Sequence, residues 1–220
     1  MSSHLAWLEH LRQERVIAVI RTDSVESALA TAFAIAKGGI RLIEITWNSP
    51  EPAALIEKLR AELPACQIGA GTLLSEQDAK DAIAAGAQFL FSPHVDIPLI
   101  ELAVNEQVPV IPGALSPTEI VTAWQAGASC VKIFPIEALG GASYLKALRA
   151  PLGHIPLIPT GGVNGSNAGS LLAAGAIAVG LGSALMPKDL LQRQDWSGMA
   201  ERVQAFLQTL NVQLQKEVCE

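Results

Sequence analysis

Short runs of aliphatic and β-branched residues recur along the chain, and each alternates with a longer, alanine-rich stretch. Small-residue turns separate them: Gly38-Gly39, and an Ala-Gly-Ala triplet at 85–87, 126–128 and 174–176. These glycines fall where a helix ends in a left-handed residue, so the pattern predicts a repeat of helix, glycine stop and strand. The predicted strands cover residues 16–21, 41–47, 67–72, 89–92, 108–112, 130–134, 156–160 and 176–180.

Eight strand–helix units favour an α/β fold, a compact (β/α)8 TIM barrel that forms a single domain over residues 1–220. Residues 1–16 predict an extra N-terminal amphipathic helix, and the tail beyond Lys188 predicts a closing amphipathic helix. The alternative is an open doubly wound sheet. That fold favours a glycine-rich turn after the first strand, but residues 19–23 contain no glycine.

Composition narrows the class of protein. The chain is 50% hydrophobic, 5% aromatic and 16% charged, which excludes a disordered chain and suits strands buried under alanine-rich helices. No run of about 18 apolar residues predicts a membrane span. The net charge is −6 and no basic stripe is present, so we expect no nucleic-acid partner and no membrane partner.

Cysteine and histidine usage points to a reduced compartment without a local metal motif. The three cysteines are widely spaced and form no CxxC pair, and the four histidines form no HxxxH pair. The N-terminus has no basic region followed by an apolar one, as a signal peptide would. We therefore expect a cytoplasmic protein. No local motif predicts a metal site, and a site assembled from distant residues stays open.

Two charged residues lie inside apolar strands. Strand alternation turns Lys132 and Glu44 toward the barrel interior, where a charge is costly unless it is paired or neutralised. Desolvation lowers the pKa of a lysine and makes its amine a nucleophile for carbonyl carbon. A structural ion pair is the alternative interpretation, but the two residues together predict Schiff-base chemistry with Glu44 moving protons.

Other candidates lie at the ends of predicted strands. Arg21 could hold a carboxylate or phosphate, while Gly69 and Gly71 would let a ligand approach the backbone. Glycine loops after the last two strands of such a barrel are the usual phosphate site. They contain Thr160, Gly161, Gly162, Gly182 and Ser183.

Taken in order, these segments resemble the 2-keto-3-deoxy-6-phosphogluconate (KDPG) aldolase family of class I aldolases. The likeness runs from about residue 14 to residue 190. Each motif alone is common, whereas the ordered set is specific. The matching segments are VIAVIR (16–21), GIRLIEIT (39–46), GAGT (69–72), FSP (91–93), IPG (111–113), KIFP (132–135), PTGG (159–162) and GS (182–183).

The resemblance implies a role for each matching residue. Lys132 would form the Schiff base and Glu44 would be the general acid and base. Thr72, Pro93 and Phe134 would line the pyruvate end, and Thr160 would lie near the aldehyde. Gly161, Gly162 and Ser183, with Gly182 beside them, would hold the phosphate. The resemblance also implies cleavage of KDPG to pyruvate and glyceraldehyde 3-phosphate, no metal or other cofactor, and a homotrimer.

One position departs from the family pattern. Many members carry arginine four residues after the glutamate, where this chain has Asn48, and we infer that Arg21 takes over the anion contact. The Asn-Ser-Pro at 48–50 also resembles the phosphogalactonate (KDPGal) branch. Oxaloacetate decarboxylation through the same iminium is a further alternative. A synthase or epimerase barrel and a non-enzymatic phosphosugar-binding barrel also remain open.

Overall fold

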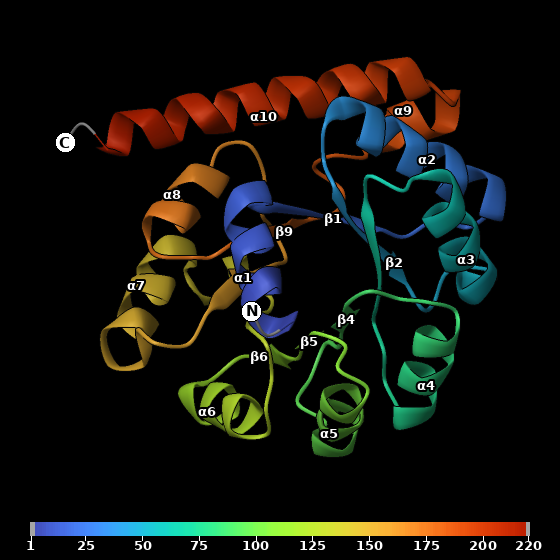
Figure 1. The fold of residues 1–220 in the computed structure, drawn as a ribbon. Coiled ribbons are helices and arrows are strands. Elements are labelled where there is room, and N and C mark those ends of the chain that lie inside the picture. The colour runs from blue at the N-terminus through green and yellow to red at the C-terminus, as the bar shows by residue number, and fades with distance from the viewer. Residues whose placement is uncertain (1–2, 219–220) are drawn as a thin grey trace.

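The structure is a computed structural model that describes residues 3–218, with side chains over residues 6–215. Its strands are all paired in parallel and form a curled sheet surrounded by helices (Figure 1). The larger sheet has the order β5-β4-β3-β2-β1-β9, and a second sheet has the order β6-β7-β8. The strands are β1 (Val16–Ile20), β2 (Leu42–Thr46), β3 (Gln67–Gly71), β4 (Leu90–Phe91), β5 (Val110–Ile111), β6 (Gly113–Ala114), β7 (Val131–Ile133), β8 (Leu157–Pro159) and β9 (Val179–Leu181).

The predicted α/β class is confirmed, but the prediction of eight strands in one closed sheet is not. The predicted fifth strand, 108–112, is shortened to β5. Pro112, which has no N–H to donate to a strand ladder, separates it from β6, a strand that was not predicted. The Lys132 N–H still bonds to the Pro112 carbonyl at 2.9 Å. At the other junction, β8 and β9 are linked by an isolated bridge between Thr160 and Gly180.

The last strand also begins later than the sequence predicts. Ala176 still belongs to the turn after α8, since its N–H bonds to the Leu171 carbonyl, and the Ile177 N–H bonds to the carbonyl of Leu157 on β8. The ladder with β1 begins only at Val179. The other predicted strands are found in place and are trimmed at their ends.

Helices alternate with the strands as the glycine repeat predicts. Ser24, Ser75 and Ser116 each cap a helix with the side chain, and Gly39 ends α2 in the left-handed conformation. Within residues 3–218, no helix combines the length and apolarity needed to cross a membrane. The helices are α1 (Ser3–Glu14), α2 (Val25–Gly38), α3 (Pro52–Glu62), α4 (Glu76–Ala84), α5 (Ile97–Asn105), α6 (Pro117–Gln125), α7 (Gly141–Leu152), α8 (Ala168–Ala173), α9 (Lys188–Arg193) and α10 (Trp196–Val218), with a 3₁₀ turn at Glu137–Leu139.

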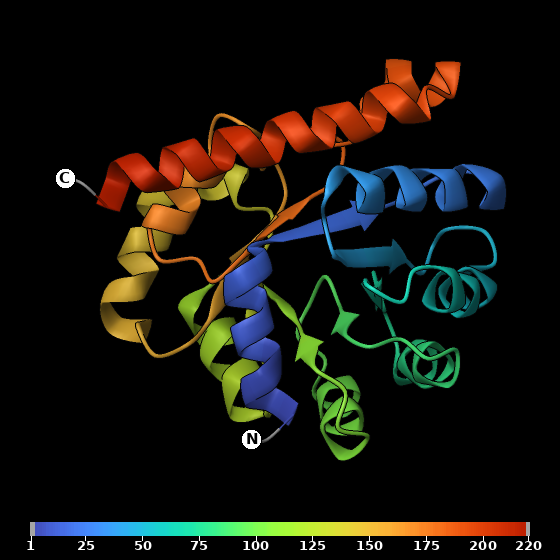
Figure 2. The same cartoon turned by 45° about the horizontal axis from the view of Figure 1, so that its top comes forward.

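Two apolar clusters hold the fold together. The outer cluster lies between the strands and the surrounding helices. The inner cluster is enclosed by the strands, and α1 covers its amino end with Trp7, Leu8 and Leu11. The rings of Trp7 and Phe89 lie 5.1 Å apart between their centroids. Figure 2 shows α1 lying against the amino ends of the strands, so the predicted N-terminal helix acts as a plug.

The C-terminal tail forms the predicted closing helix. α10 runs along α2 and α8, and it buries Met199, Val203 and Leu210 against them (Figure 1). With the amino end of the strands covered by α1, the polar side chains inside the strands are left for the carboxyl end.

Candidate active site

Lys132 lies on β7 with its side chain inside the ring of strands. Its neighbours Val131 and Ile133 face the outer cluster, as alternation requires. The side chain is 6% exposed, and its Nζ lies 4.7 Å from the ring centroid of Phe134 and 5.8 Å from that of Phe91. Burial lowers the pKa of Lys132, the Glu44 carboxylate opposes this shift, and the Arg21 guanidinium adds to it. The amine is therefore easier to deprotonate than that of an exposed lysine.

Glu44 enters the same interior from β2. It is 1% exposed, and its Oε1 is buried without a hydrogen-bond partner among the described residues. Burial raises the pKa of Glu44, while Lys132 and Arg21 lower it. No ion pair within 4.0 Å joins Glu44 to Lys132 in the described chain. The two groups therefore interact through space and not through a direct ion pair.

The two glycines of β3 leave space for neighbouring side chains and not for a ligand. A Cβ at Gly71 would overlap with the Glu44 carboxylate, and a Cβ at Gly69 would overlap with the Phe89 ring. The expectation that these glycines let a ligand approach the backbone is therefore corrected. Gly71 instead makes the space in which the Glu44 carboxylate lies.

Arg21 and Thr72 meet at the mouth of the strands. The Arg21 Nη2 donates a hydrogen bond to the Thr72 Oγ1 at 3.4 Å. Thr72 has φ +60, a conformation that is a true outlier for a β-branched residue and that costs free energy. The exposed Arg21 guanidinium keeps most of its donors available to an anion.

Pro93 and Phe134 come from neighbouring parts of the same rim. Pro93 follows β4, and Gly113 on β6 packs directly against its backbone, where a Cβ would not fit. Phe134 is 38% exposed and covers Lys132 from the solvent side. Asn48 stands where many family members carry arginine, and it is exposed after β2.

The glycine loops lie after β8 and β9. Gly161 and Gly162 have φ +87 and +84, values that favour glycine. The side chains of Asn164 and Asn167 donate to the Gly162 carbonyl at 3.2 and 2.9 Å and so fix this peptide. Within the described chain, the N–H groups of Gly161, Gly162 and Ser183 have no acceptor. Free backbone donors of this kind bind phosphate oxygens.

The same loop holds Thr160 and an acidic residue that the sequence analysis missed. The Thr160 Oγ1 is buried without a described partner, and it faces Gly180. Glu137 packs its side chain against Gly162, and its N–H donates to the Gly161 carbonyl at 3.2 Å. Glu137 lies in an exposed turn outside any predicted strand, so no local pattern marks it.

In the part of the chain that the structure describes, no three His, Cys, Asp or Glu side chains gather as a metal site would require. The buried polar groups at this end of the strands include an amine, a carboxylate and a hydroxyl, contributed by Lys132, Glu44 and Thr160.

A buried amine and a buried carboxylate, at the carboxyl ends of parallel strands beside free backbone donors, define a site suited to covalent lysine chemistry on a phosphorylated carbonyl compound. The chain belongs to the KDPG and KHG aldolase family, whose model matches residues 8–202. The resemblance seen in the motifs is thus confirmed.

Individual relatives cover most of the chain. The 2-dehydro-3-deoxy-phosphogluconate aldolase of Treponema pallidum is 36% identical over 204 residues, 93% of this chain and 97% of the relative. The KDPG aldolase structure from Legionella pneumophila has a TM-score of 0.83 at 32% identity and covers 89% of this chain and 95% of its own. It holds pyruvate as a covalent carbinolamine. A native KDPGal structure has a TM-score of 0.82 at 32% identity and covers 91% and 96%.

Proposed function

We propose that this protein is a class I aldolase that cleaves KDPG to pyruvate and glyceraldehyde 3-phosphate through an imine on Lys132. The observation that carries the proposal is the buried Lys132 amine, whose pKa is lowered, beside the buried Glu44 carboxylate, whose pKa is raised. The two shifts bring the pKa values closer together. A proton can then pass between the groups, directly or through water, at a small free-energy cost.

The chemistry begins with the neutral Lys132 amine. Its lone pair attacks the C2 keto carbon of the substrate, and Glu44 delivers a proton to the carbonyl oxygen. Glu44 then assists loss of water from the carbinolamine, which leaves an iminium. The Glu44 carboxylate takes the proton of the C4 hydroxyl, directly or through water, while the C3–C4 bond breaks with its electron pair moving into the iminium. An enamine forms and the aldehyde leaves. Protonation of the enamine at C3 and hydrolysis release pyruvate and restore the amine.

The rim residues divide the substrate between two ends of the site. Thr72, Pro93 and Phe134 would line the pyruvate end, with Arg21 holding its carboxylate. The position of Phe134 over Lys132 supports this assignment. Phe134 also excludes water from the amine, which keeps the pKa of Lys132 low.

The phosphate would lie on the other loops. The free N–H groups of Gly161, Gly162 and Ser183, with Gly182 beside them, supply donors without adding formal charge. Thr160 would face the incoming aldehyde with its unpartnered Oγ1. The nearby Glu137 carboxylate would repel a phosphate that entered too deeply, so we place the phosphate on the outer side of this loop.

Substrate preference is the second question. KDPGal cleavage has the support of Asn48 and of the KDPGal structural relative. Oxaloacetate decarboxylation needs only the same iminium as an electron sink. The values of kcat/KM for KDPG, KDPGal and oxaloacetate decide among them, and we expect the largest value for KDPG.

We further propose that the two sheets close into one (β/α)8 barrel, that residues 1–220 form a single domain, and that the cytoplasmic enzyme is a homotrimer that needs no metal. The hydrogen bond from Lys132 to Pro112 and the bridge from Thr160 to Gly180 support closure. Light scattering on the purified protein measures the oligomeric state. Activity that survives EDTA supports metal independence, and zinc-restored activity would contradict it.

The proposed function is tested by turnover. KDPG is incubated with the protein, and pyruvate and glyceraldehyde 3-phosphate are measured separately with coupled dehydrogenases. We expect the two products in equal amounts. Binding of KDPG without product would instead favour the phosphosugar-binding barrel, and conversion without pyruvate would favour a synthase or epimerase.

A further inference from the structure

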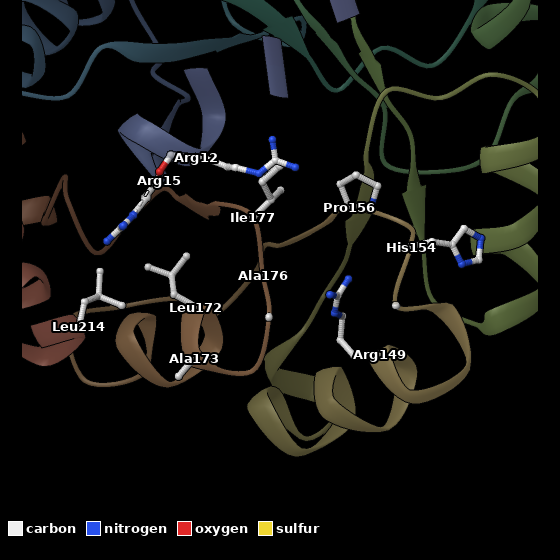
Figure 3. A pocket seen from close by; sticks show the side chains of 12 residues that line it. Arg12, Arg15, Arg149, His154, Pro156, Leu172, Ala173, Ala176, Ile177 and Leu214 are labelled. Atoms are coloured by element: carbon white, nitrogen blue, oxygen red, sulfur yellow. Dashed lines mark hydrogen bonds between the residues drawn. The ribbon is translucent and has the colours of Figure 1, made fainter. Parts of the chain in front are cut away.

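A large cavity lies at the end of the molecule opposite to the active site. Its volume is about 630 Å³, and it opens among the C-terminal ends of α1, α7 and α8 and the chain entering β8 and β9. Figure 3 shows its walls: Ile177 and Pro156 lie between α1 and α7, and Leu214 of α10 lies at one side. The cavity is therefore separated from Lys132 by the inner apolar cluster that α1 plugs.

The charge in this cavity is one-sided. Arg12, Arg15, Arg149 and His154 line it, and no acidic residue is among its described lining. The chain as a whole has a formal charge of −6, so the three arginines among the lining residues run against its overall charge. Clustered guanidinium groups repel one another and are stabilised when an anion neutralises them.

The arginines retain most of their hydrogen-bonding capacity. A guanidinium has five N–H donors. Arg15 uses its Nε on the Arg12 carbonyl and Arg149 uses its Nη1 on the Ile155 carbonyl, both at 3.2 Å. Arg12 makes an ion pair of 3.8 Å with Glu9, in which both side chains are more than half exposed. Such a pair adds little stability and competes weakly with a ligand.

Arg149 is held in place by the fold. It is half-buried, and a Cβ at Gly175 would lie 2.8 Å from its Nε, so a side chain there would displace the guanidinium. Its bond to the Ile155 carbonyl fixes the outer nitrogen as well. In Figure 3, Arg149 points from α7 into the space below Arg12, which reaches across from the end of α1. A preorganised arginine loses less entropy when it binds an anion.

We propose that this cavity, which we call the amino-end cavity, binds a small anion carrying two or more phosphate groups, with Arg12 and Arg149 as its main contacts. Two planar guanidinium groups match the oxygens of two phosphates bidentately. Arg15 and His154 extend the site on its two sides, and the apolar wall of Ile177 and Pro156 accepts an uncharged part of the ligand. The site does not rest on the aldolase chemistry.

The molecule carries its own reporters for the test. It has four tryptophans. The Trp124 ring lies 6.4 Å from the His154 ring, between their centroids, beside the amino-end cavity. Trp47 follows β2 at the carboxyl end, where its N–H bonds to the Gly71 carbonyl. Fluorotryptophan labelling gives one fluorine NMR resonance for each, and single Trp→Phe variants assign them.

The experiment titrates the full-length labelled protein with pyrophosphate at low chloride concentration. We expect the Trp124 resonance to shift and saturate. Arg12→Gln and Arg149→Gln should each weaken this binding about tenfold or more, the loss of one charge-assisted contact. The control Arg193→Gln removes an exposed arginine paired with Asp189 on α9, outside the cavity, and should leave the affinity unchanged.

Three results would overturn the proposal. The first is a Trp124 resonance that does not saturate with pyrophosphate. The second is equal affinity in the Arg12→Gln, Arg149→Gln and Arg193→Gln proteins. The third is saturation by citrate alone, since this would assign the site to carboxylates and not to phosphates. A shift of the Trp47 resonance alone would report pyrophosphate in the active site, and it would overturn the proposal in the same way as the first result. Because Arg12 is exposed, Arg12→Gln gives a readable result even if Arg149→Gln fails to fold.

Discussion

The two ends of the strands differ in what they bury, which is a pair of charged residues at the carboxyl end and apolar side chains at the amino end. At the carboxyl end, Lys132 and Glu44 are buried without a direct ion pair, and both have shifted pKa values. At the amino end, Trp7, Leu8 and Leu11 of α1 close the interior with apolar contacts, and the charged arginines stay outside.

The carboxyl end therefore serves the chemistry, and the amino end serves the stability of the fold. Burying charges without partners lowers the stability of the fold, whereas burying the apolar side chains of the plug raises it. The active site can keep its strained and desolvated groups because the opposite end of the same strands is well packed. Substitutions at the two ends should therefore affect different measurements.

The largest expected effect is on turnover in Lys132→Met. The variant keeps the length of the side chain and removes the nucleophile, so we expect kcat for KDPG to fall by at least about 10⁴-fold. Its Tm should change little, because removal of a costly buried amine is offset by loss of its favourable interaction with the Glu44 carboxylate. The matched control is Lys58→Met on α3, where the lysine is exposed and paired with Glu62. A Lys132→Met protein with near wild-type turnover would show that the chemistry does not depend on this amine at the carboxyl end.

Glu44→Gln should come next. Loss of the proton carrier lowers kcat by about 10²–10⁴-fold, while the far-ultraviolet circular dichroism spectrum stays unchanged. The exposed Glu62→Gln serves as the control. Equal turnover in the two variants would leave Glu44 with a structural role only.

Leu11→Ala examines the amino end. Leu11 is fully buried in the plug, so we expect a loss of about 2–5 kcal/mol in the free energy of unfolding. Turnover per folded molecule should be nearly unchanged at a temperature where the variant is folded. Urea denaturation measures the first quantity and the coupled assay the second. Val212→Ala, at a residue 52% exposed on α10, is the control.

Gly71→Ala changes a single contact at the carboxyl end. A Cβ here would overlap with the Glu44 carboxylate and displace it, so we expect both lower kcat and a loss of about 1–3 kcal/mol in stability. At Gly165 the nearest atom to such a Cβ is the Phe206 Cδ2 at 3.8 Å, an ordinary contact. If Gly165→Ala and Gly71→Ala behave alike in both assays, the carboxylate does not depend on that space.

Features that depend on a single stretch of chain could be predicted from the sequence. The glycine stops and the alternation on β2 and β7 are local. The glycine stops located the strands, and the alternation predicted that Lys132 and Glu44 point inward. The order of the motifs, from VIAVIR to the glycine loops, located the family.

Features that depend on the pairing of distant segments could not be predicted. The space that Gly71 gives to Glu44 follows from the register of β2 against β3. The contact of Glu137 with the glycine loop and the gathering of Arg12 with Arg149 bring together segments that no sequence period relates. Likewise, the interruption of the ladder between β5 and β6 depends on where Pro112 falls.

The central claim is that the Lys132 amine forms an imine with the keto substrate. Its most direct test is reduction with borohydride in the presence of pyruvate at neutral pH, followed by digestion and mass mapping of the peptides. Because burial lowers the pKa of Lys132, we expect this amine to react ahead of an exposed lysine. We predict one reduced pyruvate adduct for each chain, on Lys132, with loss of aldolase activity. An adduct on another lysine, or no adduct in an active protein, would contradict the account.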